Sequence, residues 1–205
     1  GQRGAVNLMT ATLEEGAGKR DATEFAQALE DLGAQVSFDV GDDSMSVNMR
    51  ALTENRDDAA ALLAEALTQP RFDEDAVDRV RAQVQAIIRS EATDPNSIAA
   101  KEMAHQAWGD HPYATSINGT AESVAQLERQ DLVAAKNRVL ARDRVFVGAA
   151  GDISAEELGP LLDKILGGLP AEGTAPLPEP AQLELTSGVT VIDWDSPQTV
   201  VAFAG

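Results

Sequence analysis

The apolar residues near the start of the chain recur at the spacing of α-helices. They share one helical face over residues 6–13, and the glycine-rich stretch 16–18 ends the pattern, which predicts a short amphipathic helix. A second helix is predicted directly after it. Asp21 and Glu24 have the spacing of an N-terminal capping box, and Gly33 can take the left-handed conformation that often follows a helix.

After Gly33 the period of the pattern changes from about 3.6 residues to 2. Apolar and polar residues alternate over 36–40 and again over 45–49, and the polar segment 41–43 between them is typical of a turn. The alternation predicts an antiparallel hairpin with one buried face. Because two strands alone are unstable in water, we expect the hairpin to pack on helices.

Most of the remaining chain is predicted to be helical. The expected helices cover about 55–68, 73–91, 96–108, 121–128 and 131–141. Ser154 and Glu157 have the spacing of a second capping box, which predicts a further helix that ends at Gly167 and Gly168. The apolar run within 144–150 predicts a strand.

A proline-rich stretch divides the chain. Four of the nine prolines fall between Pro170 and Pro180, in a region without periodicity, which predicts a stiff linker over 170–187. We expect residues 1–169 to form one α+β domain, in which an antiparallel or mixed β-sheet is packed on one face by several helices. Residues 188–205 contain two short strand-like runs, which predict the opening hairpin of a second domain.

Composition and charge narrow the classes of function. A chain of 205 residues that is 43% hydrophobic can bury a large core. Its 16 Lys and Arg against 34 Asp and Glu give a formal net charge of -18, which disfavours binding to nucleic acid or to an anionic membrane. No apolar run approaches the roughly 20 residues of a membrane-spanning helix, so we expect no direct membrane insertion. The expected partner is a protein, a peptide or a cation.

The residues that could carry catalysis form no recognisable site. The chain has no cysteine, and its two histidines, His105 and His111, are separated by Gly109, so they cannot form a helical metal-binding pair. His105 is expected to be a partly exposed residue of a helix rather than a metal ligand. His111 is expected to make a hydrogen bond that anchors the loop before Pro112 rather than to act in catalysis. Neither the zinc-binding motif H-x-x-E-H nor the serine-nucleophile motif G-x-S-x-G occurs in the sequence. The residues therefore favour a non-enzymatic role, and they identify no binding residue.

The order of the elements resembles the M16 metallopeptidases, the pitrilysin or insulinase-like family, and especially its bacterial and mitochondrial-processing-peptidase-like branch. The resemblance extends over nearly the whole chain. It rests on the glycine-led helix within 4–16, the Asp94-Pro95 pair after the long helix, the loop 111–120, and the glycine-aspartate turn at 151–152. It also implies a first strand before residue 1.

In that family the first helix carries the H-x-x-E-H zinc motif, and the long helix carries a glutamate ligand. The matching positions in this chain are Asn7, Thr10, Ala11 and Ile87. All three zinc ligands and the general base are thus replaced. The resemblance implies an inactive subunit with no catalytic residue, no metal ligand and no cofactor.

Active and inactive subunits of this family close around a chamber that holds an extended peptide. The resemblance therefore implies a heterodimer with a zinc-bearing M16 peptidase, in which this chain helps to enclose and position peptide substrates, and it implies a periplasmic location. Two alternatives remain open. One is a structural core subunit of a larger membrane or respiratory complex, and the other is an enzyme whose site combines acidic residues with His105 or His111.

Overall fold

The computed structural model describes residues 2–174, 180–184 and 188–203. Its α-helices are α1 (Ala5–Ala11), α2 (Ala22–Asp31), α3 (Arg56–Thr68), α4 (Glu74–Glu91), α5 (Pro95–Trp108), α6 (Ala121–Ala125), α7 (Arg129–Val139) and α8 (Ala155–Leu166). Its strands are β1 (Gly16–Ala17), β2 (Arg20–Asp21), β3 (Gln35–Val40) and β4 (Met45–Arg50). Short 3-10 turns cover η1 (Thr53–Asn55), η2 (Pro112–Ala114) and η3 (Arg142–Arg144).

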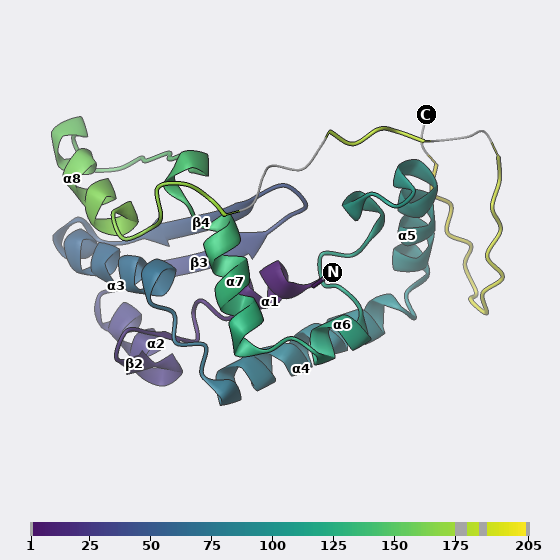
Figure 1. The fold of residues 1–205 in the computed structure, drawn as a ribbon, viewed down its shortest axis with the longest axis horizontal. Coiled ribbons are helices and arrows are strands. Elements are labelled where there is room, and N and C mark those ends of the chain that lie inside the picture. Colours follow the sequence, from purple (N-terminus) through teal and green to yellow (C-terminus); the bar gives the residue numbers. More distant parts are fainter. Residues whose placement is uncertain (1, 175–179, 185–187, 204–205) are drawn as a thin grey trace.

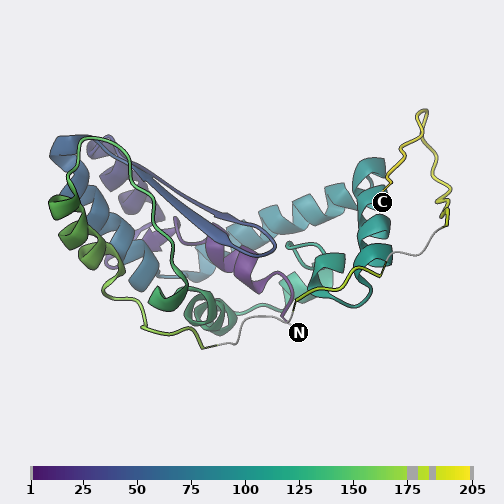
Figure 2. The ribbon, with the colours of Figure 1, turned by 90° about the horizontal axis from the view of Figure 1, so that it is seen from above.

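These elements form an elongated crescent (Figures 1 and 2). The β3–β4 hairpin, α2, α3 and α8 lie at one end and α5 lies at the other, with the long helix α4 running between them. The predicted α+β class is confirmed, and helices dominate it. Of the described helices, none is long and apolar enough to cross a membrane.

The helix ends follow the local signals in the sequence. The Asp21 carboxylate accepts a hydrogen bond from the Glu24 backbone N–H at 2.9 Å, and the Glu24 carboxylate accepts one from the Asp21 N–H at 3.1 Å. Ser154 and Glu157 make the same reciprocal pair at the start of α8. Gly33 has a φ of 58° directly after α2. The predicted capping boxes and the left-handed glycine are therefore confirmed.

The predicted hairpin is also confirmed. β3 and β4 pair in antiparallel register from Val40 opposite Met45 to Gln35 opposite Arg50. The inward residues of β3 are buried, and those of β4 are half-buried. A small second sheet, in which β1 pairs with β2, was not predicted, since two-residue strands leave no alternation to detect.

Two strand predictions are wrong. Residues 145–150 run without regular structure after η3, and residues 188–203 contain no strand within the part that the structure describes. An apolar run indicates strand propensity, but a strand also needs a neighbour to accept its backbone hydrogen bonds, and neither run has one here. In the predicted linker, 170–174 and 180–184 have no regular structure, while 175–179 and 185–187 lie outside the described residues, as do 204–205. The division into domains stays a prediction.

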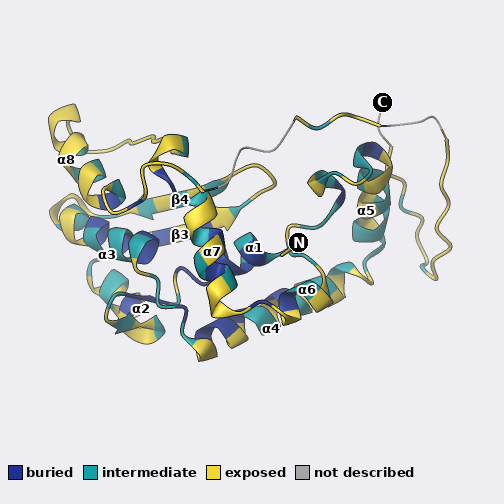
Figure 3. Ribbon diagram, in the orientation of Figure 1, coloured by how far each residue is buried: buried dark blue, intermediate teal, exposed yellow. Residues whose placement is uncertain are grey.

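The hydrophobic core lies where α1 meets the hairpin, α3, α4 and α7 (Figure 3). Its largest fully buried apolar side chains are Phe25, Phe72, Leu8, Met9, Leu13, Leu132 and Val124. The first helix is thus a central core element, since Leu8 and Met9 have no exposed surface. Anything that displaces α1 will disturb the whole core.

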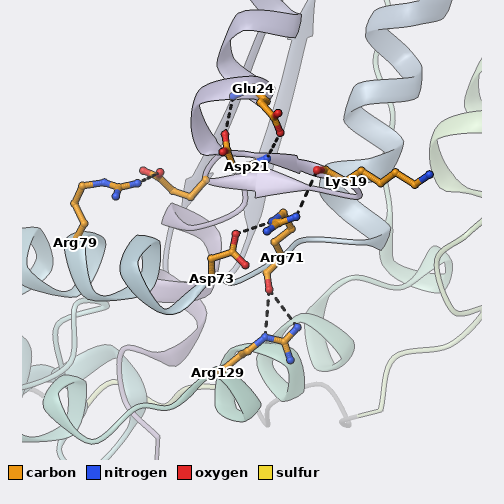
Figure 4. Close-up of polar contacts among 8 residues, drawn as sticks. Lys19, Asp21, Glu24, Arg71, Asp73, Arg79 and Arg129 are labelled. Atoms are coloured by element: carbon orange, nitrogen blue, oxygen red, sulfur yellow. Dashed lines mark hydrogen bonds and ion pairs between the residues drawn. The ribbon is translucent and has the colours of Figure 1, made fainter.

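Arg71 braces the segment that leads into α4 (Figure 4). Its Nε donates to Asp73 Oδ2 at 2.6 Å and its Nη1 to the Lys19 carbonyl at 3.5 Å, while its own carbonyl accepts from the Arg129 guanidinium at 3.2 Å. The next residue, Phe72, is buried with a φ of 49°, a left-handed conformation that costs free energy for a bulky residue. The hydrogen bonds hold the chain in this conformation.

We expect Arg71→Ala to lower the free energy of unfolding measurably, because the hydrogen bonds to Asp73 and Lys19 that hold the left-handed Phe72 are lost. Chemical denaturation measures the change. Arg89→Ala, on the exposed side of α4, is the matched control and should stay within about 0.5 kcal/mol of the unsubstituted protein. Equal effects of the two substitutions would contradict the bracing role of Arg71.

An ion pair joins the start of α3 to the start of α8. The Arg56 Nη2 donates to Glu157 Oε1 at 2.6 Å, and the backbone N–H of Ser154 donates to the same carboxylate at 3.0 Å. These hydrogen bonds, with the charge of Arg56, lower the pKa of Glu157 from its ordinary value of 4.5 to about 2. The Glu157 carboxylate is therefore charged at any pH near neutrality.

This lowered pKa predicts a specific pH dependence of stability. A carboxyl group with a depressed pKa stabilises the fold above its ordinary pKa, so the contribution of Glu157 is complete above 4.5 and is lost as the pH falls towards about 2. We expect the stability difference between the unsubstituted protein and Glu157→Gln to be constant above pH 5 and to shrink steadily below it. Denaturation curves at several pH values test this, and a difference that does not change with pH would refute it.

Candidate functional site

The first two positions matched to zinc ligands lie on α1, which packs against α4. Asn7 is half-buried and Ala11 is exposed, and their spacing of four residues places them on one face of the helix. Thr10 instead is 2% exposed, and its hydroxyl contacts the Met45 sulfur at 3.7 Å. Thr10 thus packs against the hairpin rather than beside Asn7.

Asn7 is the first member of a chain of polar contacts that ends on α4. The Asn7 Nδ2 donates to Asn118 Oδ1 at 2.8 Å, and the Asn118 Nδ2 donates to Glu91 Oε1 at 2.7 Å. Ser116 Oγ lies 3.4 Å from the second Glu91 oxygen. Ile87 lies one helical turn before Glu91, so the two share a face of α4. The structure therefore places the fourth matched position on the α4 face that Asn118 joins to Asn7.

Glycines let the loop that carries Asn118 approach α1 closely. Gly4, the N-cap of α1, has a φ of 83°, and a Cβ there would lie 2.6 Å from the Asn118 carbonyl oxygen. Gly119 has a φ of 79°, and a Cβ there would lie 2.7 Å from the Arg3 carbonyl oxygen. Ser123 Oγ donates to that same Arg3 oxygen at 3.0 Å. The backbone on both sides thus fixes Asn118 beside Asn7.

The side chains at the matched positions do not fit a zinc ion. Zinc in proteins is bound by imidazole, thiolate or carboxylate groups, whereas these positions offer an amide, a hydroxyl, a methyl and a sec-butyl group. Glu91 is the one carboxylate in the polar chain, and Asn118 and Ser116 already donate to it. No group of three or more potential metal ligands occurs among the described residues.

The histidines take the ordinary structural positions expected of them. His105 is exposed on α5. The His111 Nδ1 accepts a hydrogen bond from the Tyr113 N–H at 3.2 Å, and the two rings pack edge to face with centroids 4.5 Å apart. The loop-anchoring role of His111 is confirmed. Tyr113 also donates to Asp43 at the tip of the hairpin, which raises the pKa of the tyrosine.

The sequence interpretation missed Asn118 and Glu91. Both belong to stretches that the resemblance includes, the loop 111–120 and the end of the long helix, but their contact joins residues 27 positions apart. The glycine at 119 was the available signal, since it marks a close backbone approach.

Comparison with known proteins places the chain in one family. A profile described as Insulinase (Peptidase family M16) matches residues 2–121. A non-peptidase homologue named YmxG from Helicobacter pylori is 26% identical over 169 residues, covering 82% of this chain and 39% of the relative. A probable mitochondrial-processing peptidase subunit beta from Schizosaccharomyces pombe is 27% identical over 208 residues, covering 98% of this chain and 45% of the relative.

Solved structures agree with this placement. The peptidase M16 inactive domain from Pseudomonas fluorescens superposes with a TM-score of 0.81 at 28% identity, over 88% of this chain and 45% of that one. A chain of Complex III2 from Candida albicans shares the fold, with a TM-score of 0.66 at 21% identity, over 89% of this chain and 41% of that one. The chain spans less than half the length of each of these proteins. Because the family profile covers more than half of its residues, the chain belongs to peptidase family M16, the insulinase family, and resembles that family's inactive members.

Proposed function

We propose that this chain is part of a non-catalytic M16 subunit that pairs with a zinc-bearing M16 peptidase and helps to enclose its peptide substrates. The observation that carries the proposal is the arrangement around Asn7. Side chains that cannot ligate zinc occupy the matched positions on α1 and α4, and an amide bridge joins the two helices where ligands would converge.

Similarity to named proteins supports each half of the proposal. The Helicobacter relative is named a non-peptidase homologue and the Pseudomonas structure an inactive domain, which supports the absence of catalysis. The Schizosaccharomyces relative is named a subunit of a processing peptidase, which supports the pairing. A periplasmic location is part of the proposal and rests on the family resemblance alone.

Two assays on the purified full-length protein test the absence of catalysis. We expect no stoichiometric zinc by elemental analysis and no cleavage of unfolded peptides by the protein alone. Addition of a zinc-bearing M16 homologue from the same source should produce chelator-sensitive cleavage that exceeds the activity of the homologue alone. Stoichiometric zinc in this protein, or chelator-sensitive cleavage without the homologue, would overturn the proposal.

The second candidate is a structural subunit of a larger membrane complex. The fold shared with a chain of Complex III2 favours it, although at 21% identity the likeness extends to the fold alone. Fractionation of native membranes separates the two candidates. Co-migration with membrane-embedded cytochromes would favour the structural role, and co-migration with an M16 peptidase would favour the paired role.

A further inference from the structure

A hydrogen bond joins the two ends of the crescent at a point away from α4. The Tyr113 hydroxyl donates to Asp43 Oδ1, in the turn between β3 and β4. Tyr113 belongs to η2, which packs against α5. The hairpin turn and the loop after α5 approach each other in both views of the fold (Figures 1 and 2). The contact between Tyr113 and Asp43 therefore links the hairpin end of the crescent to the α5 end.

Two neighbouring rings fix the position of Tyr113. Its ring packs edge to face on Trp108, with centroids 5.4 Å apart, and on His111, with centroids 4.5 Å apart. The His111 backbone is itself anchored, since its N–H donates to the Trp108 carbonyl at 2.9 Å. The His111 side chain then holds the next turn, because its Nδ1 accepts the Tyr113 N–H at 3.2 Å. The direction of the Tyr113 hydroxyl thus depends on His111.

The hydrogen bond to His111 Nδ1 exists in only one charge state of the ring. A neutral imidazole accepts a hydrogen bond through one nitrogen, whereas an imidazolium carries a proton on both nitrogens and can only donate. Imidazole side chains ordinarily change their charge between about pH 5 and pH 8. A proton on the His111 ring therefore removes the acceptor and brings two N–H groups together.

Tyr113 itself keeps its proton in this range of pH. The hydrogen bond to Asp43 raises the pKa of Tyr113 above its ordinary value of 10.0. The phenol therefore stays a donor near neutral pH, and a change in its contact with Asp43 has to come from another group.

The other ionisable groups around this loop are mostly acidic. Asp110 directly precedes His111, and the hairpin turn carries Asp42 and Asp43. The segments that contact the loop or α5 add Glu91, Lys101, Glu102, His105 and Glu184. Because acidic groups stabilise a nearby positive charge, these surroundings are compatible with a proton on the His111 ring.

We propose that His111 is a pH-sensitive switch for the contact between Tyr113 and Asp43. While the ring is neutral, it holds Tyr113 against Trp108, and the hydroxyl binds the hairpin turn. When the ring gains a proton, the Tyr113 N–H turns to water, the phenol leaves Asp43, and the hairpin turn separates from η2. The core around α1 is untouched, so the domain stays folded while this contact opens. The switch is a property of this domain and does not depend on the proposed partner.

A distance measurement between spin labels at positions 44 and 101 of the intact protein tests the switch. Both positions are exposed, one in the hairpin turn and the other on α5. We expect a narrow distribution of distances at about pH 8 and one at least about twofold broader at about pH 5, where a protonated His111 is expected. The charge of Glu157 is retained at both pH values, so acid destabilisation of α8 does not interfere.

Three variants assign the response to its residues. An asparagine side chain also accepts an N–H two residues later but does not titrate, so His111→Asn should keep the narrow distribution at both pH values. Tyr113→Phe lacks the hydroxyl and should give the broad distribution at both. His105→Asn, the matched control at the exposed histidine of α5, should respond to pH like the unsubstituted protein.

The same measurement can overturn the proposal in three ways. An unsubstituted protein whose distances do not change with pH contradicts it, whether or not the variants fold. A pH response that persists in His111→Asn, or that disappears in His105→Asn, assigns the titration to another group. A narrow distribution in Tyr113→Phe would show that the hydroxyl does not hold the hairpin turn.

Discussion

The triple substitution Asn7→His, Ala11→His and Ile87→Glu is expected to create a zinc site that binds about one ion per chain. The two histidines would lie one turn apart on α1, and the new carboxylate would project from the face of α4 that Asn118 joins to Asn7. Three such ligands with a water in the fourth position make a typical catalytic zinc site. Zinc titration monitored by calorimetry measures the binding.

A matched control isolates the position of the carboxylate. Arg89 lies two residues after Ile87, which places it on the other side of α4. The variant Asn7→His, Ala11→His, Arg89→Glu carries the same histidines and a new glutamate, yet it should bind zinc at least about tenfold more weakly, because one ligand is out of reach. Equal affinities for the two variants would show that α1 and α4 do not retain the ligand arrangement.

Gly4→Ala is expected to lower the free energy of unfolding by about 3 kcal/mol, the largest effect that we predict for a single substitution. A left-handed backbone costs an L-residue roughly 1–2 kcal/mol. The new methyl group would also lie 2.6 Å from the Asn118 carbonyl oxygen and 3.0 Å from Val124 Cγ2, and relief of that contact costs about as much again. Chemical denaturation measures the loss.

Gly148→Ala is the control for this substitution. Gly148 is exposed, its φ lies outside the left-handed region, and a Cβ built there meets no neighbouring atom within 4 Å, so the alanine should change the free energy of unfolding by no more than about 0.5 kcal/mol. A Gly4→Ala protein that is as stable as the unsubstituted one would mean that the loop carrying Asn118 does not press on the start of α1.

Local signals in the sequence predicted local structure well. The capping boxes at Asp21 and Ser154 and the alternation of the hairpin each depend on residues a few positions apart, and the structure reproduces them. The strand predicted over 144–150 failed because pairing depends on a neighbour that no local pattern reveals. The left-handed conformation of Phe72 was likewise unpredictable, since it depends on the distant contacts of Arg71 and Arg129.

The candidate site was predictable only in part. Asn7, Thr10, Ala11 and Ile87 were identified from the family resemblance, because composition and spacing give no reason to single them out. The contact between Asn118 and Glu91 needed the structure, as did the separation of Thr10 from the other positions. Long-range contacts between polar side chains have no signature in a single sequence.

The most direct test of the account is to purify the full-length protein from its source under mild, low-salt conditions and to identify by mass spectrometry what co-elutes in stoichiometric amount. Low salt matters because contacts of a protein with a net charge of -18 are sensitive to ionic strength. The account predicts an M16 homologue that carries H-x-x-E-H, in about equal amount with this protein. Elution without such a homologue, under conditions that keep other native complexes intact, would contradict the paired-peptidase function.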